Sequence, residues 1–149
     1  MNLLIKRLTP TAVVPRYHSP AAAGLDLHAD LLGEGCRMTL TGGRLATMQR
    51  MHRIETGLAF EIPPGHVGII TGRSSLSARG LIAATGVVDA DYRGPVSVML
   101  WVMDGQHAIE HGDRIAQMLI IAAPQFAIVE AEQLSETARN TGGFGSSGR

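Results

Sequence analysis

The sequence predicts an all-β fold, a jelly-roll-like barrel or sandwich with one short helix. Apolar and polar residues alternate over 25–31 and 36–40, and a period of two is typical of half-buried strands. Glycine and proline recur at short intervals along the chain, which contains 18 glycines and 7 prolines. Closely spaced turns of this kind join the short strands of small sandwiches and barrels.

Length and composition predict one compact domain followed by a tail. A chain of 149 residues with 45% apolar and 17% charged residues has the size and composition of a single folded domain. From residue 135 the sequence is rich in glycine and serine, and Phe144 is the only large apolar side chain there. We therefore expect a β-barrel domain over 1–134 and a flexible C-terminal segment over 135–149.

Two segments, 96–103 and 114–123, are apolar on both faces of the strands they predict. A strand of this kind is normally covered on both sides. In a domain this small, another subunit can supply the second cover.

Charge and cysteine content exclude several classes of protein. Thirteen Lys and Arg balance thirteen Asp and Glu, so the chain lacks the basic surface that binds nucleic-acid polymers. Cys36 is the single cysteine, which excludes an intrachain disulfide framework and favours a reducing compartment. The longest apolar runs fall far short of the ~20 residues of a membrane span. With no secretory signal expected at the start, we predict a cytoplasmic protein without a membrane partner.

Segment 86–94, GVVDADYRG, places Asp89, Asp91, Tyr92 and Arg93 between glycines. Aspartate and glycine are common in turns, so the segment alone predicts the tip of a β-hairpin. A carboxylate held on a rigid turn can also orient and deprotonate a water molecule.

Segment 72–77, GRSSLS, predicts the start of a helix over 74–81, with Ser74 as the N-cap and Gly80 at the end. Backbone N–H groups, hydroxyls and the guanidinium of Arg73 would together suit a phosphate group. An ordinary helix start with an exposed arginine explains these residues equally well.

Three further segments are ambiguous when taken singly: AGLDLHA at 23–29, GDRIAQ at 112–117 and RNTGGFGSSGR at 139–149. The first fits the solvent face of a strand, and the second a surface Asp–Arg pair before core residues. The third lacks the GK[ST] ending of a P-loop, so a disordered linker fits it equally well.

Taken in order, these five segments resemble the five sequence motifs of the trimeric dUTPases. The similarity runs from Ala23 to Gly148 and includes TGLAFEIPPG at 56–65. It implies a jelly-roll subunit and a homotrimer whose active sites combine pieces of different subunits. It also implies magnesium-dependent hydrolysis of dUTP to dUMP and pyrophosphate, which controls the ratio of dUTP to dTTP and supplies dUMP for thymidylate synthesis.

The resemblance also implies roles for individual residues. Asp89 matches the catalytic aspartate that activates water, and Tyr92 matches the tyrosine that packs on the deoxyribose and excludes UTP. Asp26, Gln117 and Arg139 complete the implied catalytic set, Asp26 as a support near the metal. The implied substrate-binding residues are Arg73, Ser74, Ser75, Thr85, Gly86, Val88, Asp89, Tyr92, Gln117, Arg139, Phe144, Gly145, Ser146 and Ser147.

The expected metal is Mg²⁺, held by the triphosphate and its waters without direct protein ligands. The six histidines lack the spacing of a zinc-binding helix, and we interpret them as surface or turn residues. Many family members have an asparagine that reads uracil shortly before the third motif, where this chain has Ala83, Ala84 and Thr85. We therefore expect backbone groups, with help from Thr85, to read the base.

Two other functions remain open at this point. The dCTP deaminases resemble this chain in overall pattern, but Met99 stands where their catalytic glutamate is expected, and a thioether cannot transfer that proton. A catalytically silent nucleotide-binding regulator is the second alternative. The presence of both Asp89 and Arg139 argues against it.

Overall fold

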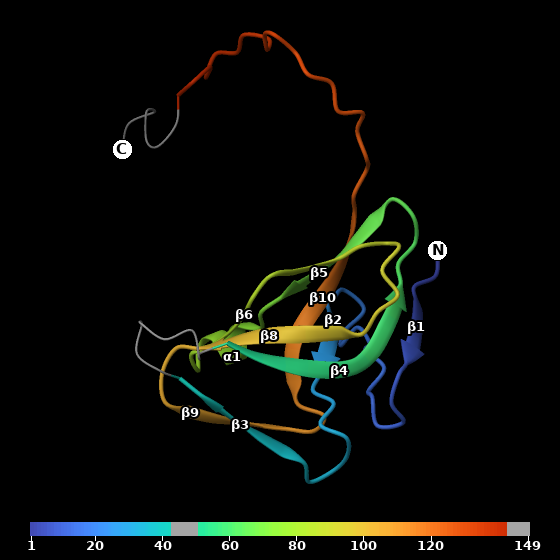
Figure 1. Ribbon diagram of the computed structural model, residues 1–149, viewed down its shortest axis with the longest axis vertical. Coiled ribbons are helices and arrows are strands. Elements are labelled where there is room, and N and C mark those ends of the chain that lie inside the picture. Colours follow the sequence, from blue (N-terminus) through green and yellow to red (C-terminus); the bar gives the residue numbers. More distant parts are fainter. Residues whose placement is uncertain (43–50, 143–149) are drawn as a thin grey trace.

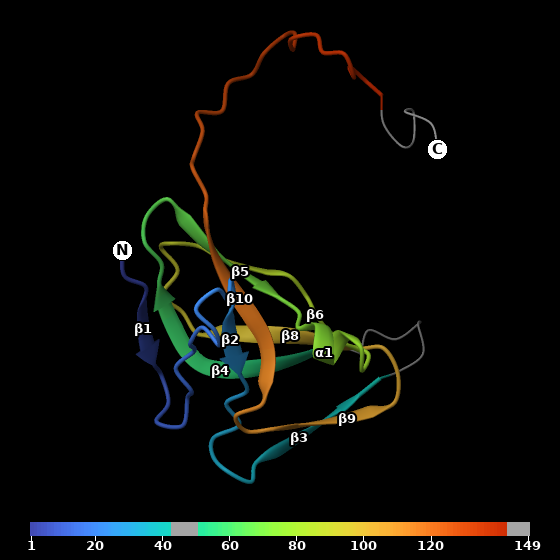
Figure 2. The same ribbon diagram turned by 180° about the vertical axis from the view of Figure 1, so that it is seen from behind.

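The computed structural model describes residues 1–42 and 51–142. Its body consists of two four-stranded antiparallel sheets packed face to face, with a small two-stranded sheet beside them (Figures 1 and 2). The first sheet has the order β1 (Leu4–Arg7), β4 (Met51–Glu61), β8 (Val96–Val102) and β6 (Leu81–Ala83).

The second sheet carries the strands that turn out to form part of the site. Its order is β2 (Leu25–His28), β10 (Arg114–Ala122), β5 (His66–Thr71) and β7 (Gly86–Val88). The two-stranded sheet pairs β3 (Arg37–Thr41) with β9 (Gln106–Glu110). With one short helix, α1 (Ser74–Ser77), in the described ranges, the predicted all-β architecture is confirmed.

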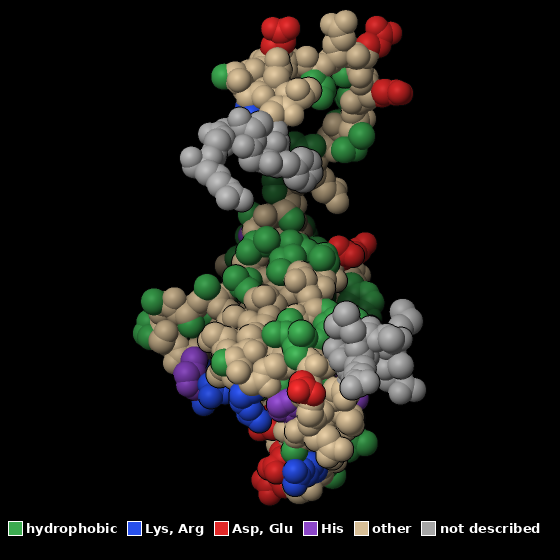
Figure 3. Space-filling model, turned by 90° about the vertical axis from the view of Figure 1, so that its left-hand side faces the viewer, with side chains coloured by type: hydrophobic (Ala, Val, Ile, Leu, Met, Phe, Trp, Pro, Cys, Tyr) green, Lys and Arg blue, Asp and Glu red, His purple; other side chains and the backbone are tan. Residues whose placement is uncertain are grey.

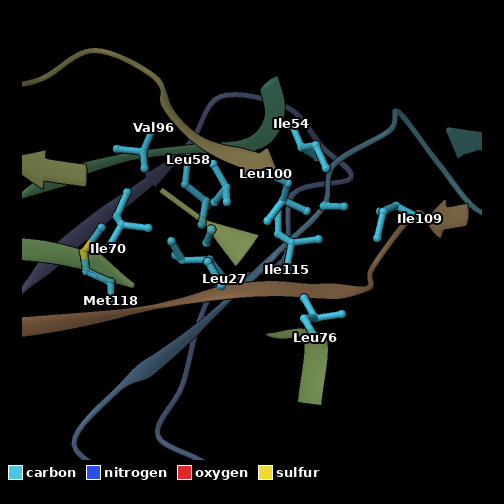
Figure 4. Close-up of a cluster of buried hydrophobic side chains, with 14 of the residues drawn as sticks. Leu27, Ile54, Leu58, Ile70, Leu76, Val96, Leu100, Ile109, Ile115 and Met118 are labelled. Atoms are coloured by element: carbon cyan, nitrogen blue, oxygen red, sulfur yellow. The ribbon is translucent and has the colours of Figure 1, made fainter. Parts of the chain in front are cut away.

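The core lies between the two sheets, because one face of each strand is apolar (Figure 4). Leu25 and Leu27 of β2 point inward, whereas Asp26 between them points away, as the alternating sequence predicts. Along β8, every second residue from Val96 to Val102 is fully or nearly fully buried. Burial of these side chains fixes the sheets against each other and leaves Asp26 of β2 and Gln117 of β10 on the outer face of the second sheet.

The helix is shorter than the predicted 74–81 and begins differently. Helix α1 spans Ser74–Ser77, and the N-cap is Arg73 rather than a serine, with no side-chain hydrogen bond capping it. Gly80 adopts a φ of 78°, a left-handed conformation that ends the turn. The buried Leu81 then pairs with Val102, so this residue belongs to the first sheet and not to the helix predicted from the sequence.

The prediction that 86–94 forms the tip of a hairpin is wrong. Strand β7 pairs with β5 in the second sheet, whereas β8 belongs to the first sheet, so the intervening residues cross from one sheet to the other. Strand β8 instead pairs with β4 along most of its length and with β6 at its end, while β7 extends the edge of the second sheet.

After β10 the chain leaves the sandwich and runs on without further strands as far as residue 142 (Figures 1 and 2). Large apolar side chains of this segment are at least 78% exposed: Phe126, Ile128, Val129 and Leu134. The outer face of the first sheet also exposes apolar side chains, among them Met51, Ile82 and Trp101. No helix in the described ranges is long and apolar enough to span a membrane.

Candidate active site

Three neighbouring strands of the second sheet bring Asp26 and Gln117 together. In the sheet register Gln117 of β10 pairs with Asp26 of β2 on one side and with Thr71 of β5 on the other. Paired residues share a face, and the flanking Leu25 and Met118 are buried. Asp26, Gln117 and Thr71 therefore form one row on the outward face of the sheet.

The Asp26 carboxylate is bracketed by two arginines. Its Oδ1 lies 3.1 Å from Nε of Arg73, and its Oδ2 lies 3.2 Å from Nη1 of Arg114. Nη1 of Arg73 also donates to the backbone oxygen of Arg114 at 3.2 Å. One carboxylate between two guanidiniums leaves one net positive charge, and such planar groups are well suited to bind phosphate oxygens.

Gln117 connects this row to the loop that precedes α1. Its side-chain Nε2 donates to the backbone oxygen of Gly72 at 3.0 Å, directly before Arg73. Ser74 and Ser75 follow with exposed side chains at the start of the helix. The second and fourth motifs are thus joined within one chain, and we call Asp26, Arg73, Arg114 and Gln117 the anion cluster.

A cavity of about 280 Å³ opens beside the anion cluster, and both charged and histidine side chains line it: Arg16, His18, Asp26, His28, Asp113 and Arg114. Burial lowers the pKa of His28 below its ordinary value of 6.5; Asp26 opposes this shift, and Arg114 and Arg73 reinforce it. Interpreting every histidine as a surface or turn residue is therefore wrong for His28, which is half-buried against the cluster. Figure 3 shows Lys, Arg and His side chains gathered together on one face of the molecule.

Asp89 and Tyr92 lie in a different region, on the crossing between β7 and β8, which we call the Asp89 loop (residues 89–95). The side chains of both residues are exposed. Asp89 lines an open cavity of about 1200 Å³ bounded by the β4–β5 turn, β1 and the start of the C-terminal segment. The Tyr92 hydroxyl donates to the backbone oxygen of Pro95 at 3.2 Å, which folds the ring back over Gly94.

The distance between the Asp89 loop and the anion cluster can be estimated along strand β5. Gly68, near the start of β5, pairs with Val88, and Thr71, at its end, pairs with Gln117. With Asp89 following Val88, about four residues of strand separate the two regions, or roughly 13 Å. A single chain therefore does not bring Asp89 to the anion cluster.

The other implied site residues lie on β7, in the connection before it and in the C-terminal segment. Thr85 is exposed between β6 and β7, and Gly86 pairs with Ile70. The Val88 side chain is buried in the core, so only its backbone is available to a ligand. In the C-terminal segment, Nε of Arg139 donates to the backbone oxygen of Gly142 at 2.8 Å. The implied residues Phe144, Gly145, Ser146 and Ser147 lie outside the described residues.

Arg114 is the site residue that the sequence interpretation missed. The pattern GDRIAQ predicts a surface Asp–Arg pair, yet the partner of Arg114 is Asp26 rather than the adjacent Asp113. The sequence signal for this pairing is the predicted half-buried strand over 25–31. A carboxylate on the partly buried face of such a strand needs a cationic or N–H partner.

Together these features define a β-sandwich protein that carries a site for an anionic, phosphate-like ligand. The family model named dUTPase matches residues 11–148, and the chain belongs to the dUTPase family. The proposed resemblance of the five motifs is thereby confirmed.

Curated relatives align with this chain over most of their own length and share one description. A deoxyuridine 5'-triphosphate nucleotidohydrolase of Anaeromyxobacter sp. (strain Fw109-5) is 43% identical over 94% of this chain and 90% of its own. A protein of the same description from Methylocella silvestris is 40% identical over 99% of this chain and 92% of its own.

Solved structures share the fold. The dUTPase of Staphylococcus bacteriophage 80alpha with dUPNHPP superposes with a TM-score of 0.87 at 26% identity, covering 99% of both chains. A mutant dUTPase from phage phi11 of S. aureus, described with a structural Mg(II) ion, superposes with a TM-score of 0.77 at 22% identity over 89% of this chain and 98% of that chain.

Proposed function

We propose that this chain hydrolyses dUTP to dUMP and pyrophosphate by in-line attack of water on the α-phosphate. The observation that carries the proposal is the anion cluster, which joins the first, second and fourth family motifs on one sheet. Supporting it, curated relatives that align with almost the whole chain are deoxyuridine 5'-triphosphate nucleotidohydrolases.

In this proposal the anion cluster binds the triphosphate. Arg73 supplies a guanidinium, Ser74 and Ser75 supply hydroxyls, and Gln117 supplies its amide. A triphosphate carries about four negative charges, which hydrogen-bond donors stabilise best when they are already in place. Arg139, with Phe144, Gly145, Ser146 and Ser147, supplies the remaining contacts from the C-terminal segment.

Asp89 orients and deprotonates the attacking water. Its exposed carboxylate stands on a loop whose ends are anchored in two different sheets, so it is held in position yet reachable by a ligand. General-base catalysis by a positioned carboxylate contributes about 10²–10⁴-fold to a rate.

Mg²⁺ completes the proposed chemistry. In the described part of the chain, no three His, Cys, Asp or Glu side chains gather closely enough to hold a metal ion. Both oxygens of Asp26 are paired with arginines, which leaves this carboxylate to contact metal-bound waters rather than to form a cage. Such a donor set fits a Mg²⁺ ion that arrives on the triphosphate and lowers its negative charge.

The nucleoside is selected by the Asp89 loop and the connection before it. Tyr92, folded over Gly94, packs against the deoxyribose, so a 2′-hydroxyl has neither space nor a partner. Uracil is read by backbone groups of Gly86 and Val88, with Thr85 beside them.

The active enzyme is a homotrimer with shared sites. Two observations support this: the roughly 13 Å between Asp89 and the anion cluster, and the exposed apolar row of Met51, Trp101 and Ile82 on adjacent strands. A second copy covers that row and brings its own Asp89 loop to the cluster.

Residues 135–149 act as a flexible lid on the barrel domain of 1–134. Ordering these residues costs about 1–2 kcal/mol of conformational entropy each, which contacts with a bound nucleotide would offset. The enzyme works in the cytoplasm, where it lowers dUTP relative to dTTP and supplies dUMP for thymidylate synthesis.

Release of pyrophosphate from dUTP tests this function, with ammonia release from dCTP measured in parallel. Pyrophosphate without ammonia is the expected result. Ammonia release would instead favour the deaminase alternative, and binding of dUTP without turnover would favour a silent regulator.

A further inference from the structure

Gly24 lies directly before β2, in contact with the Gln117 side chain. Its backbone does not require glycine, because it is absent from the residues with positive φ. The reason for glycine at this position must therefore be space rather than conformation.

A side chain at Gly24 would collide with Gln117. An ideal Cβ on Gly24 would lie 2.5 Å from Oε1 of Gln117, and 3.2 Å from its Cβ and from its Cδ. Contacts this short require one group to move. Gln117 is the group that can, because its amide is the far end of a flexible side chain whereas its Cβ is fixed by β10.

Movement of the Gln117 amide would break its contact with the loop before α1. In the structure its Nε2 donates to the backbone oxygen of Gly72 at 3.0 Å, while Oε1 lies over Gly24. The Gly72 carbonyl directly precedes Arg73, whose guanidinium pairs with Asp26. A shift of the amide therefore reaches the phosphate-binding residues without disturbing the core.

We propose that Gly24 is a positioning residue, whose missing side chain fixes the orientation of the Gln117 amide and, through Gly72, the position of Arg73. The inference rests on the proposed function, since it assigns Gly24 a part in binding the triphosphate. Gly24 itself does not touch the substrate. Because Gly24 has no side chain, the Gln117 side chain can occupy the space beside it and donate its amide hydrogen bond to the Gly72 carbonyl.

The test is a double-mutant cycle of Gly24→Ala and Gln117→Gly, with Ala23→Ser as a matched control that adds an atom to the neighbouring exposed residue. Pyrophosphate release from dUTP gives kcat and KM for each variant. Thermal unfolding of each variant, without nucleotide, gives a readout that does not depend on activity.

For the activity arm, Gly24→Ala is expected to lower kcat/KM by about 3- to 10-fold, the effect of one hydrogen bond. In the Gln117→Gly background the same change is expected to cost nothing further, because the amide, Cδ and Cβ that it would meet are all absent. Ala23→Ser should retain wild-type kinetics. Equal losses from Gly24→Ala in both backgrounds, or none in either, would overturn the proposal.

For the stability arm, the sign of the effect should reverse. With Gln117 present, Gly24→Ala lowers the melting temperature through the clash. With Gln117→Gly, it raises the melting temperature, because no side chain then opposes the new Cβ and alanine restricts the unfolded chain at a φ that it can adopt. A drop in both backgrounds would overturn the proposal. If the wild-type chain releases no pyrophosphate, the proposed function fails, while this reversal still decides whether Gly24 positions Gln117.

Discussion

The anion cluster and the Asp89 loop hold their side chains in different ways. In the cluster, Asp26, Arg73 and Gln117 come from three separate elements and are tied by ion pairs and a hydrogen bond across the sheet. In the loop, Tyr92 bonds to the Pro95 carbonyl and Arg93 to the Ala90 carbonyl, so these hydrogen bonds stay within the loop, and Arg93 also lies 3.9 Å from Glu61 of β4.

In the proposed function the two regions have different tasks: the anion cluster binds the phosphates, and the Asp89 loop activates water. Strand register places Asp26 and Gln117, two residues of the anion cluster, side by side within one chain, because residues paired across a sheet share a face. Asp89, which we propose activates water, stands apart from them, and in the proposed trimer another copy of the chain brings it to the bound nucleotide. The predictions below change one region at a time.

The largest effect is expected from Asp89→Asn in the loop. Turnover should fall by about 10²–10⁴-fold because the general base is lost. Binding of a non-hydrolysable dUTP analogue and the melting temperature should stay unchanged, since Asp89 is exposed. Asp91→Asn, which alters a neighbouring exposed carboxylate, is the matched control with near-normal turnover. Near-normal turnover in Asp89→Asn would remove Asp89 from the mechanism.

Truncation after Ala138 should slow turnover by on the order of 10²-fold, since it removes the Arg139 guanidinium from the phosphates. The protein should remain folded, because Phe144 is the only large apolar residue in the removed sequence. Limited proteolysis with and without a dUTP analogue gives a second measurement, with protection of the segment only when the analogue is present. Equal protection in both states would contradict the lid.

Arg114→Met tests the anion cluster and should weaken binding of the dUTP analogue by about 10-fold. Methionine keeps much of the apolar stem but removes the charge, which takes the cluster from one net positive charge to none. The salt dependence of binding should fall as well. Arg37→Met, at an exposed position of β3, is the control expected to leave both quantities unchanged. Unaltered affinity in Arg114→Met would show that Arg114 only orients Asp26.

Tyr92→Ala should raise activity on UTP relative to dUTP by a few-fold, because it opens the space for a ribose hydroxyl. Gly94→Ala should move the ratio in the same direction, since a Cβ at Gly94 would lie 2.9 Å from Cε2 of Tyr92 and displace the ring. Steady-state kinetics with both nucleotides measure the ratio. If neither variant changes it, sugar selection lies outside the Asp89 loop.

The smallest effect is on stability at low pH, through Asp30, a buried carboxylate outside both regions. Burial raises the pKa of Asp30, but hydrogen bonds from Thr9, Thr11 and the Leu32 N–H, together with nearby His111, outweigh it, so the pKa lies below its ordinary value of 3.8. A lowered pKa means that Asp30 contributes stability above about pH 4 and loses it as the pH falls through the folded value.

Asp30→Asn should therefore lower the unfolding free energy at pH 7 by about 1–3 kcal/mol and flatten its decline below pH 4. Denaturant unfolding over this pH range gives the measurement, with Glu34→Gln as the exposed control. An unchanged pH profile in Asp30→Asn would mean that other carboxylates control acid stability.

Local pattern predicted the strands but not their partners. The alternation at 25–31 assigned Leu25 and Leu27 to the core, because a period of two is a property of the strand itself. Pairing is not local, and so the hairpin predicted for 86–94 is instead a crossing between sheets. The same limit explains Arg114, whose partner Asp26 is distant in sequence.

The measurement that tests the central claim most directly mixes two inactive variants. Asp89→Asn lacks the general base, and Arg73→Ala lacks a phosphate-binding group. If each site joins the anion cluster of one copy to the Asp89 loop of another, refolding the two variants together in equal amounts restores about one quarter of wild-type turnover, because each region is intact in about half of the copies. Turnover no higher than that of the separate variants would contradict the account.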